Sequence, residues 1–186
     1  MGTKATLGML AMLGALLTGC LPHEEVLLTT APGGAYHIGS GDQVRVIVFN
    51  QPTLSNVYGV DASGNISLPV AGPIKAENRT TRQLEAAIAN RLRESDYVTD
   101  PKVAVEIAVY RPFSIMGEVR TPGRFAYAPG MSVEGAIALA GGYTMHADKD
   151  RIRIRRRVGD EVYTAEISPL STFQPGDTLI VMERWL

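Results

Sequence analysis

The sequence predicts an α+β fold built from β-hairpins and two isolated helices. β-Branched runs flank short glycine turns, as at Gly159-Asp160, and such pairs of runs are typical of antiparallel hairpins. Helical spacing of apolar residues occurs in two segments, Thr81 to about Glu94 and Val133 to Ala140. Strands and helices do not alternate regularly, so the pattern does not favour a parallel sheet with a helix after each strand.

The first twenty residues predict that the chain is secreted. Lys4 precedes an apolar stretch from Ala5 to Leu17, and the segment ends in Leu17-Thr18-Gly19-Cys20. A short basic start, a short apolar run and small residues at the end are typical of a secretory signal. The apolar run is shorter than the ~20 residues that a transmembrane helix needs. We therefore expect residues 1–19 to be a signal peptide and residues 20–35 to be a linker.

Composition narrows the class of protein further. Cys20 is the only cysteine, so no disulfide can form within one chain, and a lone thiol in a secreted protein needs another explanation. The formal net charge is −1, and loss of Lys4 with the signal peptide lowers it by one more. A nucleic-acid binder would carry a basic surface, so we expect no nucleic-acid partner.

Residues 36–110 form the first predicted unit. The expected strands run from Gln43 to Phe49 and from Val103 to Val109, and a hairpin around Ala62-Ser63-Gly64 is expected to join Tyr58–Asp61 to Asn65–Leu68. Pro69 and Gly72-Pro73 should break the strand pattern after this hairpin.

The helix of the first unit has clear signals at its start and along one side. Thr80 and Gln83 fit a capping box, in which each side chain accepts a hydrogen bond from the other residue's backbone. Leu84, Ile88 and Leu92 recur at four-residue steps, which predicts one narrow buried stripe.

Residues 111–186 form the second predicted unit, which begins at the boundary Arg111-Pro112. The expected elements are a hairpin of Phe113–Val119 with Arg124–Tyr127, a helix capped by Ser132 and closed by Gly141-Gly142, a hairpin of Arg151–Val158 with Glu161–Ile167, and a last strand from Thr178 to Met182. The glycines at the helix end should place at least one residue at positive φ.

A run of arginines in the second unit allows two interpretations. Along a strand, Arg151, Arg153, Arg155 and Arg157 fall on one face, while Ile152 and Ile154 face the core. These arginines would contact an acidic polysaccharide or a neighbouring subunit, or else form a solvated sheet face or a charged edge that prevents aggregation. The second interpretation is favoured, because a single run of charge is weak evidence of function.

Candidate catalytic and cofactor sites find little support in the sequence. The glycines of Gly39-Ser40-Gly41 precede a strand rather than a helix, so they predict a tight turn held by Asp42 and not a dinucleotide loop. His23, His37 and His146 lack metal-binding spacing, Ser132 fits a helix cap better than a nucleophile, and Asp148 and Asp150 lie together in a loop. Four aromatic residues could stack on sugars, but packing is the favoured use for Tyr36, Tyr110, Tyr127 and Trp185. We expect no catalytic residue, cofactor or metal.

Several motifs together resemble one known family. Leu17-Thr18-Gly19-Cys20 resembles the lipobox of bacterial lipoproteins, in which the cysteine is acylated, and Leu21 after it resembles the outer-membrane type. Several segments resemble the polysaccharide export domain, namely Tyr36–Val46, Asp61–Pro69, Gly72 with the helix from Thr80 to Leu92 that contains Gln83-Leu84, and Asp100-Pro101-Lys102-Val103. Three further segments, Met116–Gly123, Ala136–Gly142 and Pro175-Gly176-Asp177, resemble the soluble-ligand-binding β-grasp (SLBB) domain. The chain is thus similar to the outer-membrane polysaccharide export (Wza-like) lipoproteins, with one export domain and one SLBB domain.

The resemblance implies that the protein lets a polysaccharide pass through it and catalyses no reaction. A member would be lipid-anchored to the outer membrane, face the periplasm and form a ring around a channel for capsule or exopolysaccharide. Its partners would be the polysaccharide and an inner-membrane co-polymerase that controls chain length. Because the chain ends at Trp185-Leu186, just after the last strand, it resembles the short GumB type without a pore-lining helix. Passage through the outer membrane would then need a separate protein such as a β-barrel.

Two other classes of function serve as rivals. The first is a monomeric periplasmic lipoprotein that binds a small soluble ligand through its β-grasp domain. The second is a lipid-anchored carbohydrate hydrolase, which would need paired carboxylates facing a cleft; the sequence offers no such pair.

Overall fold

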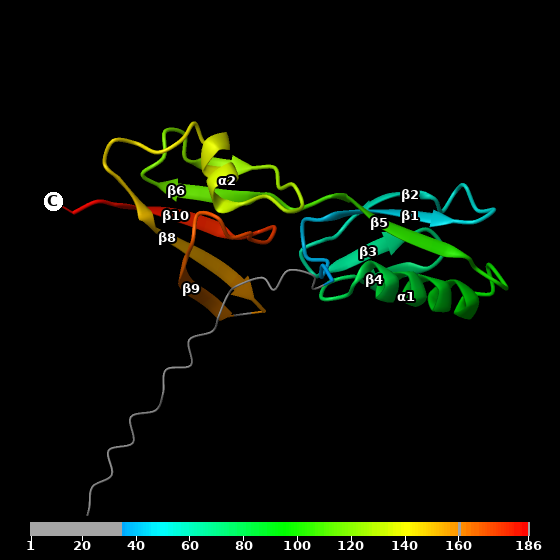
Figure 1. Ribbon diagram of the computed structural model, residues 1–186. Coiled ribbons are helices and arrows are strands. Elements are labelled where there is room, and N and C mark those ends of the chain that lie inside the picture. The colour runs from blue at the N-terminus through cyan, green and yellow to red at the C-terminus, as the bar shows by residue number, and fades with distance from the viewer. Residues whose placement is uncertain (1–34, 160, 186) are drawn as a thin grey trace, which may run out of the picture.

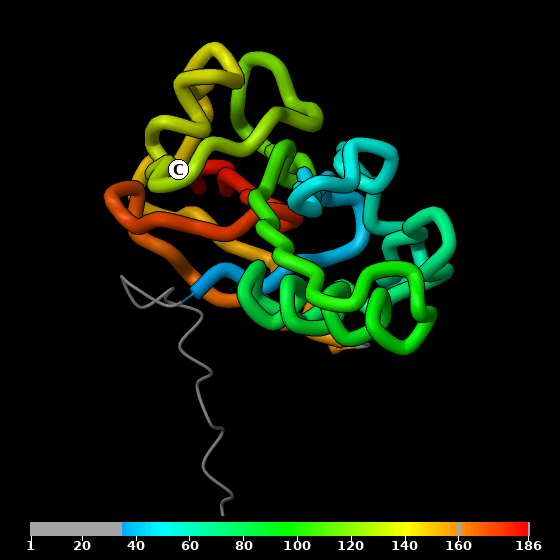
Figure 2. Tube along the Cα trace, turned by 90° about the vertical axis from the view of Figure 1, so that its right-hand side faces the viewer, coloured from blue at the N-terminus to red at the C-terminus, as the bar shows by residue number. Residues whose placement is uncertain are grey.

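The computed structural model describes residues 35–159 and 161–185. The predicted signal peptide, most of the linker and Asp160 lie outside these residues. Figure 1 shows two bodies end to end, and Figure 2, which looks from the end of the first body, shows the second body behind it. Each body has its own cluster of buried apolar side chains. Sheets and two helices mix within the described residues, so the predicted α+β class is confirmed.

The first body contains two small antiparallel sheets. Strand β1 (Gln43–Val48) lies between β2 (Asn56–Gly59) and β5 (Val103–Val109), and β3 (Asn65–Leu68) pairs with β4 (Gly72–Lys75). Alternate residues of β1, namely Val44, Val46 and Val48, are buried. The pattern of one buried and one exposed side along the strand is what the sequence alternation predicts.

The hairpin that was expected to join β2 to β3 is wrong. A turn does form there, because Gly64 has a φ of 76° and Asp61 accepts hydrogen bonds from Ser63 and Asn65. After the turn, however, β3 pairs with β4 across Val70, and the paired Ile66 and Ile74 are both buried. Pro73 fits into β4 because this strand lies at a sheet edge, where a missing N–H is tolerated. Burial of the isoleucine pair therefore outweighs the breaking effect of proline and glycine.

Helix α1 (Thr81–Glu94) matches its prediction closely. The Thr80 backbone N–H donates to Gln83 Oε1 over 2.9 Å, and the Gln83 N–H donates to Thr80 Oγ1 over 3.2 Å. Leu84, Ile88 and Leu92 are fully buried. The helix packs along β4 and β5, and Glu85 accepts a hydrogen bond from the Val105 N–H.

The second body is a five-stranded sheet with one helix. Its strands, in spatial order, are β7 (Gly123–Phe125), β6 (Phe113–Gly117), β10 (Thr178–Glu183), β8 (Ala147–Val158) and β9 (Glu161–Ile167). The pair of β6 and β10 is parallel and the other pairs are antiparallel. The hairpins of β6 with β7 and of β8 with β9 are as predicted.

Helix α2 (Val133–Leu139) covers one face of this sheet (Figure 1). Ser132 caps it as predicted, because its Oγ accepts a hydrogen bond from the Gly135 N–H over 3.1 Å. Gly141 and Gly142 follow it with φ values of 78° and 86°, which confirms the expected left-handed helix end. The buried side chains between helix and sheet include Ile137, Ile152, Ile154 and Leu179.

Candidate functional site

Charged side chains gather in two regions of the molecule, one between the two bodies and one on the second body. The first is the junction, where Tyr36, Asp42, Arg111, Arg156 and Asp177 meet between the two bodies. The second is the arginine face, which consists of Arg151, Arg153, Arg155 and Arg157 on β8.

Asp42 is the centre of the junction. Its side chain is fully buried, yet it accepts a hydrogen bond from the Gly39 N–H (2.8 Å), as the predicted tight turn requires. It also accepts from the Tyr36 hydroxyl (2.6 Å), from the Arg111 N–H (2.7 Å) and from Arg111 Nη1 (3.3 Å). A buried carboxylate with this many donors is satisfied, so Asp42 fixes the start of the second body onto the first turn of the first body.

The Arg111 side chain lies between two glycine turns that are far apart in the sequence. Its Nε donates to the Pro175 carbonyl over 3.0 Å, while its Nη1 lies on the other side against the Gly39 turn. A Cβ at Gly39 would lie 1.8 Å from Arg111 Nη1, and a Cβ at Gly176 would lie 2.7 Å from Arg111 Nε. Both glycines therefore provide the space that the guanidinium occupies, and Arg111 connects the two bodies.

A second buried ion pair lies beside the Pro175-Gly176-Asp177 turn. Arg156 binds both carboxylate oxygens of Asp177, through Nε (2.8 Å) and Nη2 (2.7 Å), and the exposed fractions of the two side chains are 12% and 2%. Asp177 also accepts a hydrogen bond from the Gln174 N–H, which closes the turn. Bidentate pairs of this kind are among the stronger charge-assisted contacts.

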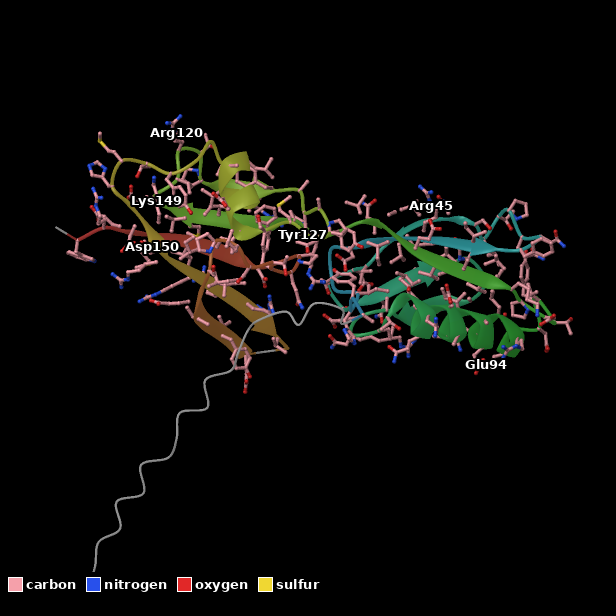
Figure 3. All side chains as sticks on the ribbon, in the orientation of Figure 1. Arg45, Glu94, Arg120, Tyr127, Lys149 and Asp150 are labelled. Atoms are coloured by element: carbon pink, nitrogen blue, oxygen red, sulfur yellow. The ribbon has the colours of Figure 1, made fainter. Side chains whose placement is uncertain are left out.

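Aromatic rings fill the remaining space of the junction. Tyr110 is in edge contact with Tyr36 (centroids 5.0 Å apart) and with Tyr127 (5.6 Å), and Tyr127 is in turn in edge contact with Phe173. Figure 3 shows Tyr127 at the end of the second body that faces the first. Burial, and then the hydrogen bond to Asp42, raises the pKa of the Tyr36 hydroxyl far above its ordinary value. These tyrosines thus pack as expected, whereas Trp185 is 82% exposed.

The arginine face lies on the side of the sheet opposite α2. Ile152 and Ile154 between the arginines are fully buried, so the predicted alternation along the strand is confirmed. The four arginines form no ion pair with a carboxylate of the described residues, and Arg155 contacts Met116 Sδ at 4.0 Å.

Other sequence candidates remain scattered. His37 and His146 are exposed. The expectation that Asp148 and Asp150 lie in a loop is wrong, because β8 begins at Ala147 and contains both residues. The Asp150 N–H donates to the Asp148 carboxylate, so the two side chains are local neighbours at the start of the strand. In the part of the chain that the structure describes, no three His, Cys, Asp or Glu side chains come together as metal ligands would. In the same residues, no helix has the length and apolarity to cross a membrane. Cys20 and His23 lie outside the described residues.

The sequence interpretation missed Arg111 and Arg156. It treated Arg111 as a boundary residue and Arg156 as one more member of the basic run. The alternation along β8 contained a signal for Arg156, because this residue has the parity of the buried Ile152 and Ile154 and a buried arginine needs a partner. No comparable local pattern points to Arg111.

Comparison with known proteins agrees with the arrangement of the two bodies. Residues 30–108 match the family described as polysaccharide biosynthesis/export protein, and residues 112–165 match the SLBB domain. The chain belongs to the polysaccharide export family. The resemblance of the chain to the polysaccharide export family with one SLBB domain is thereby confirmed. The Gly39–Asp42 turn lies within the matched export domain, whereas the Pro175–Asp177 turn lies beyond residue 165, and Arg111 lies between these two turns.

Three curated relatives of this export family chain are similar over much of its length. The exopolysaccharide production protein ExoF of Rhizobium meliloti (strain 1021) is 33% identical over 69% of this chain and 35% of its own length. The polysialic acid transport protein KpsD of Escherichia coli is 29% identical over 84% of this chain and 31% of its own length. The EPS I polysaccharide export outer membrane protein EpsA of Ralstonia solanacearum is 31% identical over 72% of this chain and 41% of its own length. The chain thus spans roughly a third of the length of these relatives.

Proposed function

We propose that this chain is a periplasmic component of an export channel for capsule or exopolysaccharide, through which the polymer passes without chemical change. The observation that carries the proposal is the order of two matched units in one chain, an export unit followed by an SLBB unit. The names of the three relatives, which concern production, transport and export of polysaccharides, support it. We place the units at residues 36–110 and 111–186, since the matched ranges end at 108 and begin at 112.

Anchoring to the outer membrane belongs to the same proposal. Acylation of Cys20 after removal of residues 1–19 would leave the body on a tether of residues 20–35, facing the periplasm. Several acyl chains hold a protein firmly to a bilayer, whereas a single chain does not. The outer membrane protein EpsA among the relatives supports this location.

Assembly into a ring would provide the channel. A ring of identical subunits needs a contact between two different surfaces whose rotation closes. We propose such a ring, with the inner-membrane co-polymerase as a partner on one side and a separate outer-membrane protein to complete the path on the other.

The decisive experiment is export in cells. Deletion of the gene should abolish polysaccharide at the cell surface and the full chain should restore it, while Cys20→Ser should lose acyl labelling, leave the outer-membrane fraction and restore little export. A deletion strain that exports at the parental level would contradict the proposal. If the purified protein stays a monomer at every concentration and export continues without it, the small-ligand lipoprotein becomes the better explanation.

A further inference from the structure

The arginine face lies on an interior strand of its sheet. β8 is hydrogen-bonded to β10 on one side and to β9 on the other, while the edges of the sheet are β7 and β9. Charged residues often protect an exposed edge strand from pairing with another chain. That explanation, which the sequence allowed for these arginines, does not apply to Arg153 and Arg155, because β8 is paired on both sides from Ile152 to Arg155; Arg157 is in register with β9 alone.

The arrangement of the four charges is unfavourable for the fold alone. Successive arginines of the face are two residues apart, which is roughly 7 Å along a strand, and charges at this distance are within the ~8 Å screening length of physiological salt. Glu166 is directly opposite Arg153 in the register of β8 and β9, but it makes no ion pair with it. Features that work against the stability of a fold are often functional.

The neighbours of the arginines suit a sugar chain. Across the sheet, Arg155 is in register with Thr178, Ser114 and then Arg124, so hydroxyl groups lie between two cations. One row further along the strands, Arg153 is in register with Ile180 and Met116, and Met116 is 48% exposed. The face therefore offers cations, hydroxyl groups and an apolar strip side by side.

We propose that the arginine face binds an anionic polysaccharide through the carboxylate groups of its sugars. This inference rests on the proposed function, since the polymer is the cargo of the export channel. A guanidinium matches a carboxylate with two parallel hydrogen bonds, and the row from Arg151 to Arg157 extends over roughly 20 Å. Apolar side chains beside it would contact the C–H faces of the sugar rings.

A second copy of this chain is a less suitable partner for the face. Three exposed carboxylates of the first body are already paired with basic side chains of the same body, as Glu77 with Lys75, Glu94 with Arg91 and Asp100 with Lys102. A neighbouring copy would thus present mixed charge at those positions rather than a strip of free carboxylates. Charge complementarity favours a polymer that carries repeated negative charge.

The row of similar sites also fits a polymer that has to move. Passage through a channel needs binding that is strong enough for the cargo to enter. The binding must also be weak enough, and spread over several sites, for the cargo to leave. Four exposed or half-exposed cations on one strand provide several equivalent contacts, so a bound chain can shift from one arginine to the next.

Binding to two labelled polymers tests the proposal with the full chain in detergent. Fluorescence anisotropy is measured with oligomers of polygalacturonate, which has a carboxylate on every sugar, and with dextran of the same length, which has none. The face variant is Arg153→Gln with Arg155→Gln. The control is Arg45→Gln with Arg82→Gln, which removes two exposed arginines of the first body and matches the change in charge.

We expect the parent to bind polygalacturonate with an affinity that falls as salt rises, and to leave dextran unbound. The face variant should bind polygalacturonate roughly tenfold more weakly, and the control should bind like the parent. Equal binding of dextran, an equal loss in the control or full affinity in the face variant would each overturn the proposal. If the face variant melts at a lower temperature than the parent, the variant Arg151→Gln with Arg157→Gln is used for the same binding measurement.

Two further measurements separate this inference from a subunit contact at the arginine face and from the proposed export function. If the face variant changes the mass of the assembly and keeps its affinity for polygalacturonate, the face is a contact between subunits and the proposal fails. Export in the deletion strain reports only on the proposed function. If the deletion strain exports normally, the proposed function fails, but the measured affinity for carboxylates remains valid. If the face variant keeps its affinity, the present inference fails, and other surfaces must account for export.

Discussion

At the junction, the guanidinium groups of Arg111 and Arg156 contact buried carboxylates. On the arginine face, by contrast, the four arginines are exposed or half-exposed and have no carboxylate partner among the described residues. The two regions meet on β8 itself. Arg155 and Arg157 are exposed, and Arg156 between them lies on the other side of the sheet and pairs with Asp177. The alternation of a strand thus assigns neighbouring residues of one type to different roles.

The difference teaches where charge contributes to stability in this protein. A buried ion pair with several hydrogen bonds is costly to break, because removal of one partner leaves the other as a buried charge without a partner or solvent. Exposed charges of one sign contribute nothing to stability and repel one another. Removal of a junction residue should therefore destabilise the fold strongly, and removal of a face residue should not.

The largest effect is expected for Asp42→Ala. This change leaves the Gly39 and Arg111 N–H groups, the Tyr36 hydroxyl and the Arg111 guanidinium without their acceptor. We expect the free energy of unfolding, measured by urea denaturation, to fall by about 3 kcal/mol or more. The matched control is Asp100→Ala, which breaks an ion pair with both side chains more than two-thirds exposed and should cost below ~1 kcal/mol. Equal losses in the two variants would remove the distinction between the regions.

Gly39→Ala should show that the glycine exists to make room for Arg111. The new methyl would collide with Arg111 Nη1, which is itself held by hydrogen bonds, so we expect a loss of about 2 kcal/mol. In an Arg111→Ala background the same change should cost almost nothing, because the colliding atoms are gone. This double-mutant cycle measures the coupling directly. A cost that is the same in both backgrounds would mean that Gly39 acts through its own backbone and not through Arg111.

A somewhat smaller loss is expected for Gly142→Val, where only the backbone is at issue. Gly142 has a φ of 86° and no atom within 4 Å of a Cβ placed on it, so the cost arises from the left-handed conformation alone. It should exceed the ~1 kcal/mol typical of glycine effects in helices, because the valine is β-branched. Gly141→Val, with Arg120 Cβ at 3.3 Å, should cost as much or more. Thermal unfolding of both variants, with the exposed strand residue Gly59→Val as control, checks the prediction; parental melting of both would contradict it.

Local patterns predicted much of this fold. The capping box at Thr80, the buried stripe of α1 and the glycine end of α2 depend on residues close together in the sequence, and all three formed as expected. The pairing of β3 with β4 depends instead on the burial of Ile66 against Ile74, which no local pattern of proline and glycine reveals.

The site shows the same division. The alternation along β8 identified the arginine face, since a strand repeats every two residues. The junction was not predictable in this way, because Asp42 and Arg111 are 69 residues apart and Arg111 and Pro175 are 64 apart. The family motifs marked the two glycine turns, but only the fold shows that one arginine side chain lies between them.

The smallest effect, with the opposite sign, is expected on the arginine face. Arg153→Gln with Arg155→Gln removes two of four like charges that lie roughly 7 Å apart, where each pair repels by about 0.6 kcal/mol in water before salt screening. The free energy of unfolding should therefore rise by a few tenths of a kcal/mol at low salt, and the gain should shrink as salt is added. Arg45→Gln with Arg82→Gln, which removes two arginines from separate elements, should change it less. A loss of more than ~1 kcal/mol in the face variant would mean that these arginines stabilise the sheet after all. In that case the face would need no ligand to explain it, and the contrast between the two regions would rest on burial alone.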